Sequence, residues 1–259
     1  MTKKIVKRGV TELITPGVSF NDEVLQSKAN NFLAAVHFGK KQMGVSFLDV
    51  STGEFFTAQG SDAYIDKLLQ NFRPSEVLVQ KQQRQQFASL FGTELHAFYL
   101  DDWVYQTDFA EESLTGHFHV NSLKGFGIHE LKEGIVSAGA VLYYLSETQH
   151  NRIQHIASIQ RIQENNFVWM DRFTLRNLEL YASKETNAVT LLDVIDNTVS
   201  PMGGRLLRRW LALPLKDLHQ INERQNIVKY LIDTPDFYEI VEYQIKQISD
   251  IERLVSKVA

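Results

Sequence analysis

Residues 31–58 read NFLAAVHFGKKQMGVSFLDVSTGEFFTA, and this stretch decides the fold of the first half of the chain. Three apolar segments, rich in β-branched and aromatic residues, are separated by short polar turns, GKKQ at 39–42 and STG at 51–53. Because tight turns between short apolar segments are typical of hairpins, the stretch predicts an antiparallel meander of three strands.

The residues after the meander alternate between helical and strand patterns. Helices are predicted over 61–72, 82–92 and 108–118, and strands at 76–80 and 95–100. A meander continued by helical crossovers predicts a mixed sheet covered by helices. We therefore expect a three-layer α/β domain over residues 20–125.

A change of period after the SLKGFG segment predicts a second, all-helical domain over residues 126–259. Apolar residues then step by three and four, as expected for a helix packed along another helix, at Ile128, Leu131, Ile135, Ala138, Leu142 and Leu145. Residues 153–162 have an isoleucine every third position, and FVWM at 167–170 is compatible with an extended segment. For these two stretches the sequence does not decide between helix and strand.

Several residues predict where the later helices begin and end. Asp171 is placed to cap one helix, and Thr190 with Asp193 forms a capping box for another. Ser200 before Pro201 predicts the start of a third helix, which Pro214 ends.

The ends of the chain predict an internal fragment of a longer protein. Residues 236–259 keep a helical apolar period without a glycine or proline stop, which predicts one continuous helix. Residues 8–18 alternate like a strand that ends at a Thr-Pro-Gly turn.

Composition excludes several classes of protein. Lys and Arg number 27 against 31 Asp and Glu, divided as 12 against 14 up to Gly125 and 15 against 17 after it. Neither half is basic, so any nucleic-acid contact must be local or lie elsewhere. The chain has no cysteine, which excludes disulfides and thiolate metal sites, and it shows no signal peptide or membrane span. We expect a cytoplasmic protein.

The stretch SPMGGRLLRRWLALPL at 200–215 holds the candidate site residues, which are Gly203, Gly204, Arg205, Arg208, Arg209 and Trp210. On a helix, Trp210 and the leucines share one side and the arginines another. Three guanidinium groups could hold phosphates, but nearby Asp193, Asp196 and Asp217 could pair with them instead. We expect Trp210 and the leucines in the core, the glycines at close-packing positions and the arginines in interdomain ion pairs.

A metal-dependent nuclease is the alternative function. Ribonuclease H-like sheets carry carboxylates that hold divalent metals, and Asp49, Asp101 and Asp102 would be the candidates here. Their positions at turns speak against such a site, because aspartate favours turns for local reasons. The sequence has no phosphate-binding loop.

Long motifs resemble the MutS family of DNA mismatch repair proteins. DRFTLRNLELY at 171–181, the segment over 190–231 and DIERLVSKVA at 250–259 resemble the core, or lever, domain of that family. RGVTELITPGV at 8–18 resembles the exit strand of its mismatch-recognition domain, and GVSFLDVSTGEF at 44–55 its connector domain.

The resemblance implies the fold and the function. Residues 1–19 would be the exit strand of a missing mismatch-recognition domain, 20–125 a ribonuclease H-like connector without nuclease activity, and 126–259 a partial core or lever domain. The whole protein would be a homodimeric, DNA-dependent ATPase that uses ATP and magnesium, recognises mispaired or unpaired bases and engages a MutL-type protein. This chain would lack the mismatch reader, clamp and ATPase, would be no enzyme and bind no cofactor or metal, and would transmit conformational change between those parts. A paralogue outside repair stays open.

Overall fold

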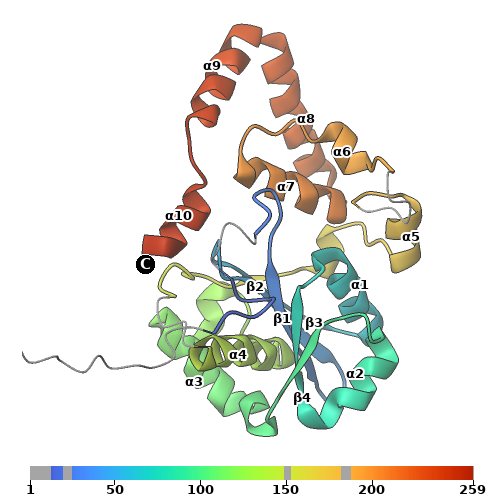
Figure 1. Ribbon diagram of the computed structural model, residues 1–259, viewed down its shortest axis with the longest axis vertical. Helices are drawn as coiled ribbons and strands as arrows, with labels where there is room; N and C mark the ends of the chain where they lie inside the picture. The colour runs from blue at the N-terminus through green and yellow to red at the C-terminus, as the bar shows by residue number, and fades with distance from the viewer. Residues whose placement is uncertain (1–12, 20–24, 149–152, 182–187, 259) are drawn as a thin grey trace, which may run out of the picture.

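A six-stranded mixed sheet, covered by helices on both faces, forms the first part of the molecule (Figure 1). The structure is a computed structural model that describes residues 13–19, 25–148, 153–181 and 188–258. The strands are β1 (Phe32–Phe38), β2 (Met43–Asp49), β3 (Glu54–Gly60), β4 (Glu76–Gln80), β5 (Ala97–Leu100) and β6 (Gln160–Arg161). Their order is β5-β4-β1-β2-β3-β6. The first three strands pair antiparallel, which confirms the meander, and β4 and β5 extend the sheet in parallel to β1.

The two faces of the sheet bury alternate residues of each strand, as the period of two in a β-strand requires. On β1, Leu33 and Ala35 enter one core, and Phe32, Ala34 and Val36 enter the other. The covering helices are α1 (Asp62–Phe72), α2 (Arg84–Phe91), α3 (Thr107–Phe118) and α4 (Lys132–Glu147). Helices α3 and α4 cover the first face, and α1 and α2 cover the second. The three-layer α/β arrangement is therefore ribonuclease H-like in strand order and layers.

Helix α4 belongs to the sheet, whereas the sequence analysis placed it in the helical domain. It packs on β1, β2 and β3 as well as on α3, and its buried residues share one core with Leu33 and Leu48. Helix α4 can approach β2 closely because β2 has a glycine at position 44. A Cβ atom there would come within 1.9 Å of the backbone oxygen of Glu133 in α4. The predicted helical period starts at Ile128, whereas α4 starts at Lys132, so Ile128 and Leu131 precede the helix. Periodicity also does not tell whether a sheet or another helix covers the apolar face.

After α4 the chain returns to the sheet. Residues 160–161 form β6, which pairs in parallel with β3, and Phe167 forms an isolated bridge with Leu215. Ile156 and Ile159 enter the core under α4, and Ile162 enters the opposite one. Neither of the two stretches that the sequence left open is helical: 153–162 contains a turn and β6, and 167–170 contains one isolated bridge. Short 3-10 helices complete the connections, at Lys81–Gln83, Asp102–Tyr105, Leu123–Phe126 and Glu164–Asn166.

The second part is helical, as predicted. Its elements are α5 (Arg172–Asn177), α6 (Leu191–Ile195), α7 (Pro201–Ala212), α8 (Leu218–Asp233), α9 (Pro235–Lys246) and α10 (Ile251–Val258). The three N-terminal caps are confirmed: Asp171 accepts from the amide of Thr174, the Thr190–Asp193 capping box is formed, and Ser200 caps α7. Helices α8 and α9 form a hairpin that projects away from the sheet (Figure 1).

The predicted continuous helix over residues 236–259 is wrong, because the chain breaks between α9 and α10. Residues 248–250 are not helical, and the Asp250 side chain accepts a hydrogen bond from the amide of Arg253. An aspartate that caps a new helix can interrupt a helical period without glycine or proline.

The predicted exit strand over residues 1–19 lies largely outside the described residues. Its end is held at the sheet, where a turn joins Thr15 to Val18 and the buried carboxylate of Glu76 accepts from the Thr15 hydroxyl, the Gly17 amide and the Tyr144 hydroxyl. None of the described helices has the length and apolar character needed to span a bilayer.

Candidate functional site at the junction of sheet and helices

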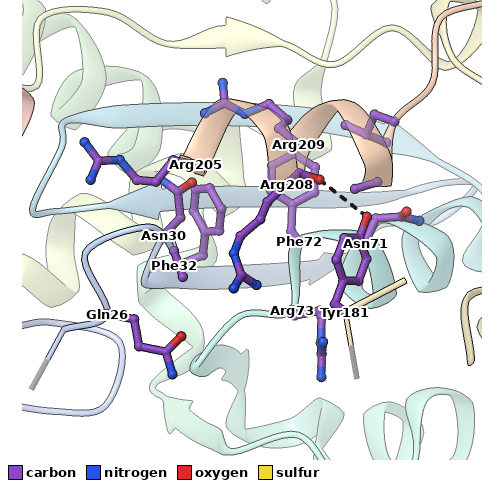
Figure 2. Close-up of a pocket in the computed structure, with 13 residues that line it drawn as sticks. Gln26, Asn30, Phe32, Asn71, Phe72, Arg73, Tyr181, Arg205, Arg208 and Arg209 are labelled. Carbon is purple, nitrogen blue, oxygen red and sulfur yellow. Dashed lines mark hydrogen bonds between the residues drawn. The ribbon is translucent and has the colours of Figure 1, made fainter. Parts of the chain in front are cut away.

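The helical part meets the sheet through charged side chains. Helix α7 lies over one end of the sheet, with the short segment 26–31 beside it (Figure 2). We call the charged residues at this contact the junction cluster: Lys28, Glu54, Arg205, Arg209, Asp250, Glu252 and Arg253. Its members come from β3, α7, α10, the residue before α10 and the segment that precedes β1.

Arg205 is the centre of the junction cluster and is only 2 % exposed. Two of its nitrogens bind both oxygens of Asp250 at 2.7 Å, and Nη2 also donates to Glu252 at 2.6 Å. Nη1 donates to the Ser27 carbonyl at 2.8 Å, and Nε donates to Glu252 at 3.2 Å. These five hydrogen bonds match the five N–H donors of a guanidinium group, so the buried charge is fully partnered.

The electrostatics of Arg205 follow from these partners. Burial alone lowers the pKa of the guanidinium, but hydrogen bonds to Asp250 and Glu252 outweigh burial and raise it above the usual value. Burial likewise raises the pKa of Asp250, and the hydrogen bond from Arg205 outweighs this and lowers it. The pair is therefore charged at any physiological pH.

Segment 26–29 is held by its backbone carbonyls. Arg253, 5 % exposed, donates from Nη2 to the carbonyls of Gln26 and Ala29, at 3.0 and 2.9 Å. The ammonium group of Lys28 binds the Asp196 carboxylate at 3.0 Å and the Thr198 carbonyl at 2.9 Å. Carbonyls of a non-helical segment thus accept hydrogen bonds from cations of α7 and α10, which tie the segment to both helices.

Arg209 links α7 directly to the sheet. Its guanidinium forms an ion pair with Glu54 at the start of β3 and lies 5.3 Å from the ring centroid of Phe56. The side-chain amide of Asn30 donates hydrogen bonds to Glu54 and to Asp49, each at 2.8 Å. One carboxylate therefore joins the helical part, the sheet and the segment before β1.

The glycines and the tryptophan of α7 have different surroundings from one another. A Cβ atom at Gly204 would lie 2.6–2.8 Å from the Lys28 side chain, so this position requires a glycine for close approach. At Gly203 the amide donates to the capping Ser200, and a Cβ atom would lie 3.1 Å from that hydroxyl. Trp210 is 40 % exposed and stacks under Arg224, with the guanidinium carbon 3.8 Å from the ring centroid.

The expectation that Trp210 and the leucines form the core of this helix is wrong for Trp210 and for Leu206, which is 43 % exposed. The buried positions of α7 are Gly204, Arg205 and Ala212. The reason is the surface against which α7 packs. Segment 26–29 presents backbone carbonyls, which require hydrogen-bond donors, and Arg205 donates to the carbonyl of Ser27.

Arg208 differs from its two neighbours. Its Nε atom is buried without a hydrogen-bond partner, and its backbone oxygen accepts from the Tyr181 hydroxyl at 3.4 Å. The side chain points into a cleft of about 450 Å³ that lies between α1, α7 and Tyr181 (Figure 2).

The three aspartates of the nuclease alternative are not brought together. Asp49 ends β2 beside the start of β1, whereas Asp101 and Asp102 follow the far end of β5. Asp49 is fully buried and accepts from Asn30, Asn31 and Ser51, which is a turn-capping role. Asp101 binds Lys81, and Asp102 binds Gln82. Within the described residues no group of three histidine or carboxylate side chains could hold a metal ion, so the geometry does not support the nuclease.

Sequence reasoning missed Lys28, Glu54, Asp250, Glu252 and Arg253. A signal was present for three of them, because DIER at 250–253 puts an N-cap residue and alternating charges before an apolar period. Nothing in the sequence linked Lys28 or Glu54 to residues about 150 positions away. Chemically, the cluster offers guanidinium and ammonium groups of Lys28, Arg205 and Arg209 that are paired with carboxylates.

Two family matches and a set of curated relatives agree with this division. Residues 31–157 match the family described as MutS domain II, and residues 173–259 match MutS domain III. Proteins named DNA mismatch repair protein MutS are 69 % identical in Flavobacterium johnsoniae, 67 % in Flavobacterium psychrophilum and 53 % in Parabacteroides distasonis. Each alignment covers 100 % of this chain and 30 % of the relative, so the chain spans less than a third of the length of these proteins.

Proposed function

Because this chain belongs to the MutS family of DNA mismatch repair proteins, we propose that it is the connecting scaffold of a protein that recognises mispaired or unpaired bases. In this proposal the scaffold transmits conformational change between a DNA-binding end and an ATP-hydrolysing end. The α/β part acts as the connector and the helical part as a portion of the core or lever. With α4 counted among the sheet elements, the connector reaches beyond residue 125.

The junction cluster is the observation that supports this role. Arg205 and Arg253 hold the same backbone segment from two different helices, and Arg209 holds the sheet. A displacement of α10 or α7 is therefore coupled to segment 26–31 and to the start of β3. Coupling between distant sites needs such an element whose position both sites can bias.

The proposal extends to the partners of the whole protein. The proposed partners are mismatched double-stranded DNA, a second copy of the same protein and a MutL-type protein, and the proposed cofactors are ATP and magnesium. We propose that the connector in this chain engages the MutL-type protein. The other partners and the cofactors would bind to parts of the protein outside this chain. We propose a cytoplasmic location and no ATPase activity for the chain by itself.

A chimaera tests the proposal. This chain would replace the matching 30 % of the Flavobacterium johnsoniae relative, and ATP-dependent release from mismatched DNA would be measured with Arg205→Met and with Arg209→Gln. We expect both variants to retain mismatch binding while ATP-dependent release slows several-fold, because the coupling element is loosened and the DNA-binding end is untouched.

The matched control is Arg84→Gln, which removes the same charge from an exposed position on α2. Release rates equal to those of the parent chimaera in both junction variants would refute a coupling role for the cluster. Loss of mismatch binding in the unsubstituted chimaera would instead contradict the proposed role of this chain as the connecting scaffold.

A further inference from the structure

The cleft beside Arg208 is open, polar and lined by arginines. It has a volume of about 450 Å³ and is bounded by the end of α1, by α7, by Tyr181 and by segment 26–32. Four arginines line it, and no carboxylate does so among the described residues. Figure 2 shows that the guanidinium groups of Arg205 and Arg209 point away from the centre of the cleft and that of Arg208 points into it, while Arg73 lies at the edge with its guanidinium group directed outward.

Arg208 and Arg73 have no ion-pair partner within the described part of the chain. The Arg208 Nε atom is buried without any hydrogen-bond partner. Arg73 follows α1 in the left-handed region, with φ of 49°, and borders the same cleft. Burial raises the pKa of Tyr181 while the charges of Arg73 and Arg208 oppose that rise, so both cations lie near this phenol.

Asp193 is the carboxylate that competes for Arg208. Its oxygen accepts from the Thr190 amide and hydroxyl, at 2.9 and 2.7 Å, and these hydrogen bonds lower its pKa more than the charge of Arg208 does. It makes no ion pair with Arg208 within 4.0 Å. The carboxylate is thus engaged in capping α6, and the guanidinium remains available.

Asn71 supplies a second, independent observation. It is 8 % exposed and lines the cleft, and its amide nitrogen donates to the Lys67 carbonyl at 2.6 Å. Its Oδ1 atom is buried and has no donor. A buried acceptor without a donor is unfavourable, and a ligand hydroxyl would supply the missing donor.

We propose that this cleft binds a small organic phosphate, with Arg208 on the phosphate from within the cleft, Arg73 on it from the edge, and Asn71 accepting from a hydroxyl of the same molecule. Guanidinium groups suit phosphate oxygens in charge and geometry. The volume exceeds that of a phosphate ion and lies within the range of small-ligand sites. The rings of Phe32, Phe72 and Tyr181 provide the apolar wall that the carbon part of the ligand requires. The proposal is independent of the repair function.

Calorimetric titration of the 259-residue chain with ribose 5-phosphate and with pyrophosphate, at constant ionic strength, tests the site. We expect one saturable site, and about tenfold weaker binding of both probes in Arg208→Gln and in Arg73→Asn, because each loses a charged hydrogen bond. Asparagine tolerates the left-handed backbone at position 73. Asn71→Leu should weaken ribose 5-phosphate but leave pyrophosphate unchanged, since only the sugar offers the hydroxyl.

Arg84→Gln is the matched control and should bind both probes like the parent chain. If Arg208→Gln fails to fold, as judged by circular dichroism, Arg208→Lys keeps the charge and should retain measurable binding. Absence of saturable binding, or equal affinity in Arg208→Gln and the parent, would overturn the proposal. Tighter binding of a short DNA duplex through the same two arginines would also overturn it in favour of backbone phosphates.

Discussion

Helices α4 and α7 both lie against the sheet, but they are held there by opposite means. Helix α4 buries eleven residues, nearly all apolar or small, in a core shared with β1 and β2. Helix α7 buries Gly204, Arg205 and Ala212, and it contacts the sheet through Arg209, which pairs with Glu54 and lies near the ring of Phe56. Beyond α7, helices α8 and α9 have no buried residue within their described spans. Helix α4 is thus held on the sheet by apolar burial, which salt does not screen. Helix α7 is attached by charged groups, which can exchange partners.

The largest expected effect on stability comes from replacing a buried isoleucine in α4. The same isoleucine-to-alanine substitution at an exposed position in α9 provides the comparison. Ile135→Ala in α4, where Ile135 is 1 % exposed, should lower the free energy of unfolding by about 2–5 kcal/mol through lost burial and a cavity. Ile240→Ala in α9, where Ile240 is 61 % exposed, should change it by about 0.5 kcal/mol or less. Urea unfolding measures both, and equal losses would break the comparison.

Acid should act first on the better-packed part. Burial lowers the pKa of His37 to about 4, and it also lowers the pKa values of His117 and His155. The Nε2 atom of His37 lies 3.1 Å from Glu133, but this contact does not offset the burial. Because the unfolded chain takes up these protons near pH 6.5, stability is full above that pH and falls as the pH drops toward 4, by roughly 2–3 kcal/mol from His37.

Thermal unfolding at a series of pH values between 7 and 4 measures this loss. His37→Gln should flatten the dependence, whereas His219→Gln, whose side chain is 80 % exposed on α8, should leave it unchanged. A steeper loss in His37→Gln would show that His37 is protonated in the folded state.

Removal of the central guanidinium should loosen α10 and segment 26–29 and leave the sheet unchanged. Arg205→Met leaves Asp250 and Glu252 without their partner, but their side chains are 17 % and 40 % exposed and can be hydrated. The expected loss is about 1–3 kcal/mol. Hydrogen exchange should quicken in α10 and in segment 26–29 and stay unchanged in β1 and β2. Equal acceleration in the sheet would mean that the two parts unfold as one unit.

The smallest effect concerns the single ion pair between α7 and β3. The side chains of Arg209 and Glu54 are 27 % and 21 % exposed, so a double-mutant cycle with Arg209→Gln and Glu54→Gln should give a coupling energy of about 0.5–1 kcal/mol. The coupling should shrink in 1 M salt, where charges are screened. A coupling that does not respond to salt would point to the contact of Arg209 with Phe56 in place of the ion pair.

Local patterns predicted much of this molecule because local physics decides them. Strands β1 to β5 and the helices over 61–72 and 201–212 follow from alternation, period and capping residues that lie within a few positions of one another. The capping box at Thr190 is a four-residue device, and its prediction needed nothing else. The break at Asp250 was missed because an aspartate within a helical period is compatible both with continuation and with a new cap.

The amino-acid sequence by itself determined the fold class, the meander that starts the sheet and the family to which the chain belongs. Only the tertiary structure decided which surface each helix face meets. It placed α4 on the sheet, buried Arg205 among carbonyls and carboxylates, left Trp210 half exposed, and joined Glu54 to Arg209 across 155 positions. The physical reason is that a period identifies the faces of a helix, whereas the free energy of each side chain depends on a partner supplied from elsewhere in the chain.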